Sequence, residues 1–186
     1  MSTQPLQQAV TSTRAVLAGV SRDQLDSPTP CKSWTVGQLV DHIVSGQFFF
    51  ATIARGEQLS GEPSKFADGD FLSAFDEGSA ACMAAFAAEG AMERTMHLPF
   101  GDMPGAAFVG LAAADTFTHG WDLAKATGQA TDLDPGLASA LLAGAKQRIQ
   151  PTFRGPDGKA PFGPEQDAPA GASNADQLAA FLGRTV

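Results

Sequence analysis

Three ionisable side chains, Asp115, His119 and Asp122, lie on the apolar face that helical spacing predicts for residues 108–126. Positions three and four apart share one face of a helix, and the apolar members of this face are Phe108, Leu111, Ala112, Leu123 and Ala126. Burying an uncompensated carboxylate costs several kcal/mol or forces it to take up a proton. A divalent cation would compensate the buried carboxylate, because Asp115 and His119, at i and i+4, can coordinate one ion.

A second histidine, His42, lies on the buried arc of another expected helix, residues 35–54. Gly46 follows it by one turn and leaves room beside the imidazole for a ligand or a neighbouring helix. A lone buried histidine is usually a core residue bonded to a backbone carbonyl, and that alternative stays open. Two histidines on the buried faces of two long helices favour shared metal ligation instead. We therefore predict a metal site formed by His42, Asp115 and His119, with coordination positions left open for water or substrate.

Two imidazoles and one carboxylate suit several divalent ions. Zinc is the first expectation, and nickel, iron and manganese also accept this set. Asp122 follows His119 by one turn, so we expect it to accept the free ring N–H of His119 and orient the imidazole. Asp122 could instead reach the metal itself or pair with Lys125 or Lys146. A buried Asp115–His119 ion pair without any metal is the remaining alternative.

The elements that must position these residues are helical. Apolar periodicity, capping residues and glycine or proline punctuation predict helices over residues 4–19, 35–54, 70–89, 105–127, 135–150 and 174–182. Residues 93–104 look extended and then turned, and residues 151–172 are rich in proline and glycine. We expect an all-α helix bundle over residues 1–150, followed by an extended tail, residues 151–186, whose short terminal helix packs on the bundle.

Composition narrows the classes of function. The chain has 186 residues, with 12 Lys+Arg against 20 Asp+Glu and a formal net charge of -8. An acidic chain without a basic run argues against nucleic acid or an anionic membrane as a partner. No apolar run reaches the roughly 20 residues of a membrane span, and the first residues show no export signal. We therefore expect a cytoplasmic protein.

Other residues that could do chemistry have simpler interpretations. Cys31 is expected to pack beside Trp34 rather than act as a nucleophile, because no histidine is near it in sequence. Asp41 points about 100° away from the metal face of its helix and should be solvated. Phe117 and Trp121 also point away from that face, so we expect them to anchor the C-terminal tail or a partner subunit.

Several stretches resemble one known family. Residues 29–42 read TPCKSWTVGQLVDH, and residues 115–124 read DTFTHGWDLA. Both are similar to the metal motifs of DinB-like metal-binding proteins, in the actinobacterial branch related to the N-terminal domain of mycothiol-dependent maleylpyruvate isomerase. LPFG at 98–101 fits the hairpin of that branch, and PFGPE at 161–165 with FLGR at 181–184 fits its tail. The resemblance spans nearly the whole chain.

The resemblance implies a DinB-like four-helix bundle, often a homodimer, with one divalent metal held by His42, Asp115 and His119. Relatives use the metal to lower the pKa of a low-molecular-weight thiol, which becomes a nucleophile. The expected function is thus a metal-dependent S-transferase or isomerase-like enzyme that takes a mycothiol-type thiol and a small electrophile. The isomerase has a glutamate at the position of Asp115. The alternative is a non-catalytic metal-binding or stress-response protein of the same fold.

Overall fold

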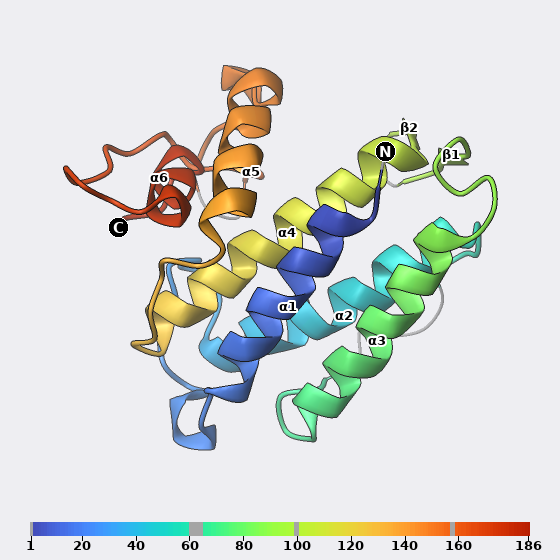
Figure 1. Ribbon diagram of the computed structural model, residues 1–186. Helices are drawn as coiled ribbons and strands as arrows, with labels where there is room; N and C mark the ends of the chain where they lie inside the picture. The colour runs from blue at the N-terminus through green and yellow to red at the C-terminus, as the bar shows by residue number, and fades with distance from the viewer. Residues whose placement is uncertain (1, 60–64, 99–100, 157–158) are drawn as a thin grey trace.

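Helices dominate the computed structural model, which describes residues 2–59, 65–98, 101–156 and 159–186 (Figure 1). The α-helices in these ranges are α1 (Gln4–Ala18), α2 (Val36–Ala54), α3 (Phe71–Ala87), α4 (Gly105–Ala126), α5 (Pro135–Arg148) and α6 (Asn174–Phe181). Two short strands, β1 (Thr95–Met96) and β2 (Met103–Pro104), pair antiparallel. Pro99 and Phe100, in the expected hairpin turn, lie outside the described residues. The expected all-α fold is confirmed, and no helix within the described ranges is long and apolar enough to cross a membrane.

The helix boundaries follow from local chemistry. The Thr35 side chain accepts the backbone N–H of Gln38, and the Gln38 side chain accepts the backbone N–H of Thr35, so a capping box begins α2 as the sequence predicts. Asp134 caps α5 by accepting the backbone N–H of Leu137 at 2.9 Å. Gly128 has a positive φ of 70°, which ends the long α4.

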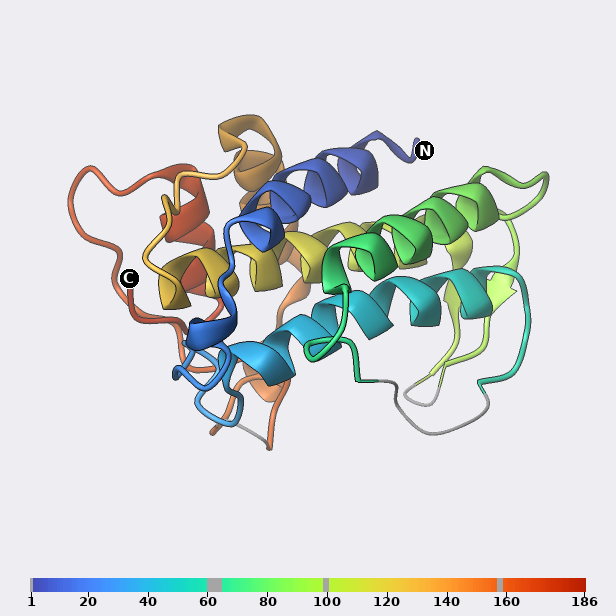
Figure 2. The same ribbon diagram turned by 90° about the horizontal axis from the view of Figure 1, so that it is seen from below.

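The four longest helices form a bundle in which each packs against two neighbours. α1 contacts α4 and α3, and α2 contacts α3 and α4. Figures 1 and 2 show that α1 and α4 run in one direction and that α2 and α3 run in the opposite direction. The helices α2 and α4 are therefore antiparallel neighbours. Their contact brings the first half of α2, which carries His42, beside the second half of α4.

The interior of the bundle is aromatic, with one polar layer. Fully buried large side chains include Phe75, Phe86, Phe108, Phe117 and Trp121. Across the layer, Thr13 Oγ1 donates to the Thr116 carbonyl at 2.9 Å, and Gln47 Nε2 donates to Thr116 Oγ1 at 2.9 Å. These bonds join α1 and α2 to α4, and they fix the helix that carries Asp115 and His119.

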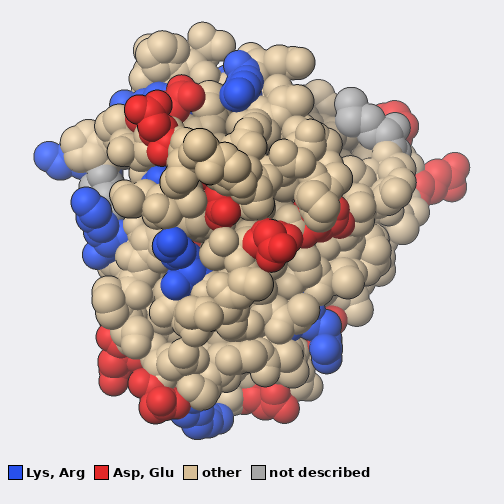
Figure 3. All heavy atoms as spheres, turned by 60° about the vertical axis from the view of Figure 1, so that its left-hand side comes forward, with Lys and Arg blue, Asp and Glu red and all other residues tan. Residues whose placement is uncertain are grey.

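The C-terminal segment packs against the bundle through α6. The indole N–H of Trp121 donates to Asp176 at 2.9 Å, which confirms that Trp121 anchors this segment. Phe117 differs from the expectation, because its side chain is fully buried in the core of its own chain. Figure 3 looks at the side of α5 and α6, where Lys and Arg side chains lie apart from one another among acidic and uncharged residues. This face therefore presents no continuous basic surface.

Asp41 is not solvated as expected. Its Oδ1 accepts the backbone N–H groups of Phe66 and Ala67 at 2.5 Å and 2.8 Å. The carboxylate therefore ties the chain that follows α2 back onto that helix. The sequence gives the direction of Asp41 on its helix but not the segment that returns to meet it.

Candidate metal centre

The three predicted ligands meet between α2 and α4. His42 Nε2 lies 3.7 Å from Asp115 Oδ2, and His119 Nε2 lies 3.7 Å from Asp115 Oδ1. One candidate ligand atom from each residue lies within 4.8 Å of the other two. The two imidazole rings meet edge to face, with centroids 4.6 Å apart. The predicted set is therefore brought together by the fold.

These separations suit a shared cation better than direct hydrogen bonds. At 3.7 Å the nitrogen and oxygen atoms are too far apart for a hydrogen bond. Two ligands that each lie about 2.1 Å from a tetrahedral ion are separated by about 3.4 Å. His42 Nε2 is buried and has no hydrogen-bond partner among the described residues. A buried nitrogen without a partner is costly, and a metal ion would satisfy it, so these side chains fit a divalent ion.

The site remains reachable from solvent on one side. The side chains of His42 and Asp115 are 35% and 28% exposed, whereas that of His119 is 13% exposed. Trp34 covers part of the group, with ring centroids 4.6 Å from His42 and 5.6 Å from His119.

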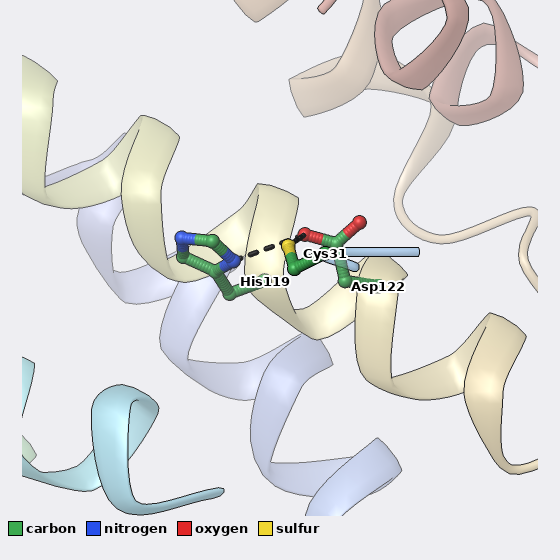
Figure 4. Close-up of side chains that lie close together, drawn as sticks. All are labelled: Cys31, His119 and Asp122. Atoms are coloured by element: carbon green, nitrogen blue, oxygen red, sulfur yellow. Dashed lines mark hydrogen bonds and ion pairs between the residues drawn. The ribbon is translucent and has the colours of Figure 1, made fainter. Parts of the chain in front are cut away.

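Asp122 contacts the ring nitrogen of His119 that faces away from Asp115. His119 Nδ1 and Asp122 Oδ2 are 3.0 Å apart, and Figure 4 shows the ring and the carboxylate directed toward each other along α4. The Nδ1–H of a neutral imidazole in this arrangement donates to the carboxylate, which leaves Nε2 with its lone pair toward Asp115. Neither lysine considered from the sequence is the cationic partner of Asp122. That partner is Arg184, whose Nε and Nη2 lie 3.1 Å and 2.9 Å from the two carboxylate oxygens.

Cys31 joins this network on the Nδ1 side of the imidazole. Its thiol donates to Asp122 Oδ2 at 3.3 Å, and Figure 4 shows the sulfur beside that carboxylate. Cys31, His119 and Asp122 are therefore a second group with the spacing of metal ligands. The guanidinium of Arg184 already neutralises Asp122, so this second group needs no further cation. From the sequence, Cys31 is a possible further ligand at the site, but spacing alone does not predict its contact with Asp122, because the two residues are far apart in the chain.

The charges of the network shift the pKa of each member. Burial raises the pKa of Asp122, but Arg184 and His119 outweigh burial and hold it well below its usual range. Burial lowers the pKa of His119, whereas Asp122, Cys31 and Asp115 together raise it to about 10. Burial also raises the pKa of Asp115, and the two imidazoles outweigh that effect, so the net pKa is lowered. Both carboxylates are thus ionised at neutral pH.

Comparison with known proteins identifies the family of the chain. The sequence model of the mycothiol maleylpyruvate isomerase N-terminal domain matches residues 6–124, which include all three predicted ligands. Two uncharacterized proteins from different strains of Mycobacterium tuberculosis are each 47% identical over 180 residues, which cover 97% of this chain and 96% of theirs. No solved structure matches the chain significantly. The chain belongs to the mycothiol maleylpyruvate isomerase N-terminal domain family.

Proposed function

We propose that this protein binds one divalent metal ion, zinc in the first instance, through His42, Asp115 and His119. The bound ion serves an S-transferase or isomerase-like reaction between a mycothiol-type thiol and a small electrophile. The observation that carries the proposal is that one ligand atom from each of the three side chains lies close to the other two. His42 Nε2, moreover, is buried and lacks a hydrogen bond among the described residues. Family membership supports the thiol as the class of substrate.

The metal, when bound, supplies one chemical effect: it lowers the pKa of a coordinated thiol so that a thiolate exists at neutral pH. The side chains of the protein neutralise the ion, orient its ligands and cover the site. Asp115 brings one negative charge to the cation and partly neutralises it. Asp122 holds Nδ1–H of His119, so that Nε2 keeps the lone pair that a ligand needs. Trp34 covers one side of both imidazoles and limits the access of water.

The reaction that this arrangement serves is a transfer of sulfur to carbon. The thiol proton leaves to solvent, and the sulfur electron pair forms a bond to the electrophilic carbon. With a substituted acceptor, the leaving group departs with the electrons of its own bond. With an unsaturated acceptor, the adjacent carbon takes up a proton from water. An isomerisation follows when the sulfur adds to a double bond, the carbon–carbon bond rotates, and the sulfur leaves.

A thiol-transfer assay tests this function. Protein stripped of metal and protein reloaded with Zn²⁺ are incubated with mycothiol and a panel of electrophiles: a haloarene, an epoxide and an unsaturated dicarboxylic acid. We expect conjugate or isomer formation only in the reloaded sample. His119→Ala should abolish it, whereas His97→Ala is the matched control, because the His97 side chain is 78% exposed and lies in the β1–β2 connection. Equal rates in stripped and reloaded protein would contradict metal-dependent catalysis.

The alternative is a non-catalytic metal-binding or stress-response protein of the same fold. A fourth protein ligand would close the site and favour that function. Cys31 and Asp122 are the nearest further donors, but they lie at Nδ1 of His119, on the other side of the ring from Asp115. This position favours a site with an open coordination position. Tight metal binding with no turnover of any acceptor, and no change in the spectrum of a Co²⁺-loaded sample on adding thiol, would establish the alternative.

A further inference from the structure

In the last segment of the chain, the side chain of Arg184 reaches Asp122 beside the proposed metal centre. Its guanidinium binds both oxygens of Asp122, at 3.1 Å and 2.9 Å, in the paired geometry that makes arginine–carboxylate contacts directional. The Asp122 side chain is fully buried and that of Arg184 is 13% exposed. The same carboxylate holds His119 Nδ1 at 3.0 Å. An unbroken series of contacts therefore runs from Arg184 to a proposed ligand.

The chain fixes the position of Arg184 independently of Asp122. The backbone N–H of Arg184 donates to the Ala179 carbonyl at 3.0 Å, at the end of α6. Gly183, directly before it, has a φ of 96°, and a side chain at this position would collide with the backbone of Gly163. Arg154 in turn donates to the Gly163 carbonyl at 3.0 Å. The guanidinium is therefore presented to α4 by a tightly packed turn.

We propose that Arg184 is a positioning residue of the metal site: by holding both oxygens of Asp122, it fixes the carboxylate that orients the His119 imidazole. Without the guanidinium, the buried carboxylate loses its main cationic partner and keeps only its contacts with the Cys31 thiol and His119. The carboxylate can then rotate, and the imidazole loses its fixed orientation. This role rests on the proposed function, since it concerns the same metal. The family match ends at residue 124, so it includes Asp122 but not Arg184.

Arg184→Gln and Arg184→Lys test the role. Glutamine removes the charge, whereas lysine keeps it but offers a point charge that cannot hold two oxygens at once. The matched control is Arg14→Gln: Arg14 also binds an aspartate, Asp76, through Nε and Nη2 at 2.6 Å and 2.7 Å, but this pair is exposed. Two quantities are measured for each protein. One is the dissociation constant for Zn²⁺ by competition with a chelator, and the other is the His119 ring nitrogen spectrum by NMR without metal.

We expect Arg184→Gln to weaken Zn²⁺ binding by about 10–100-fold, the range for residues that orient a metal ligand, with a smaller loss for Arg184→Lys and none for Arg14→Gln. The His119 Nδ1–H signal should shift or broaden in the Arg184 variants alone. If Arg184→Gln does not fold, the Zn²⁺ affinity and the His119 spectrum of Arg184→Lys decide the question. Unchanged affinity and an unchanged His119 spectrum in the folded Arg184 variant would overturn the proposal while leaving the metal function intact. If the wild-type protein takes up no metal, the proposed function fails, and the NMR spectrum alone decides whether Arg184 orients His119.

Discussion

Metal affinity should rise steeply with pH, because a proton and the metal compete for His119. In the absence of metal, burial lowers the pKa of this imidazole, but Asp122, Cys31 and Asp115 raise it to about 10. A nitrogen must be deprotonated before it can bind a metal. Since about 10 lies three units above neutrality, removing the proton at pH 7 costs on the order of 4 kcal/mol at 1.36 kcal/mol per unit.

The raised pKa of His119 determines how the apparent association constant for the metal depends on pH. The apparent association constant should increase about tenfold per pH unit between about pH 7 and pH 9, and the constant at pH 7 should be on the order of a thousandth of its limiting value. Without metal, stability should change in the opposite direction. A raised pKa stabilises the fold fully below the ordinary imidazole pKa, and this contribution is lost as the pH rises toward about 10.

Competition between the protein and a chelator of known pH dependence measures this slope. His97→Ala should keep it, because the His97 side chain is largely exposed. Asp122→Asn should flatten it, since the Asp122 carboxylate is a main cause of the raised pKa of His119. An association constant for Zn²⁺ that stays level across this pH range, with binding intact, would refute the assignment of His119 as a ligand that exchanges a proton for metal.

Three further substitutions test the packing that positions the site, each by thermal unfolding and metal content. Gly46→Ala should stabilise the protein by about 0.5–1 kcal/mol and keep the metal, because its methyl group would lie 3.8 Å from Asp115 Oδ2, an ordinary contact. Gly120→Ala should destabilise it by about 1–3 kcal/mol, because the new methyl group would collide with the buried Thr13 hydroxyl and break its bond to α4. A lower unfolding temperature for Gly46→Ala would contradict the contact described for Gly46 and α4. An unchanged one for Gly120→Ala would contradict the contact described for Gly120 and α1. Phe117→Ala should lower the free energy of unfolding by about 3–5 kcal/mol, because this ring fills the core, and should leave the metal stoichiometry unchanged. Loss of metal from the folded variant would contradict a role of Phe117 in the core alone.

The helices and the ligand set could be predicted from sequence because both depend on local spacing. Asp115 and His119 are one turn apart, so any helix through them places both on one face. Burial of that face was evident from its apolar neighbours. His42 could be added because its helix also has an apolar arc. The meeting of the two faces required only that α2 and α4 be neighbours, which a four-helix bundle readily provides.

The partners of Asp122 could not be predicted in the same way. Lys125 and Lys146 are the basic residues that the sequence suggests for Asp122, whereas in the structure its cationic partner is Arg184. Arg184 is 62 residues away in sequence, and its approach depends on how the last turn of the chain packs. One sequence signal was present: an arginine directly after the glycine that ends an apolar terminal helix. Spacing alone does not connect this arginine to α4.

Metal content tests the central claim most directly. Protein purified without added chelator, then the variants His42→Ala and His119→Ala, and His97→Ala as a control, are analysed for zinc, nickel, iron and manganese against protein concentration. We predict one equivalent of a divalent metal in the wild-type protein and in His97→Ala, and a loss of stoichiometric metal in the other two. One full equivalent of metal retained by both His42→Ala and His119→Ala would contradict the assigned site.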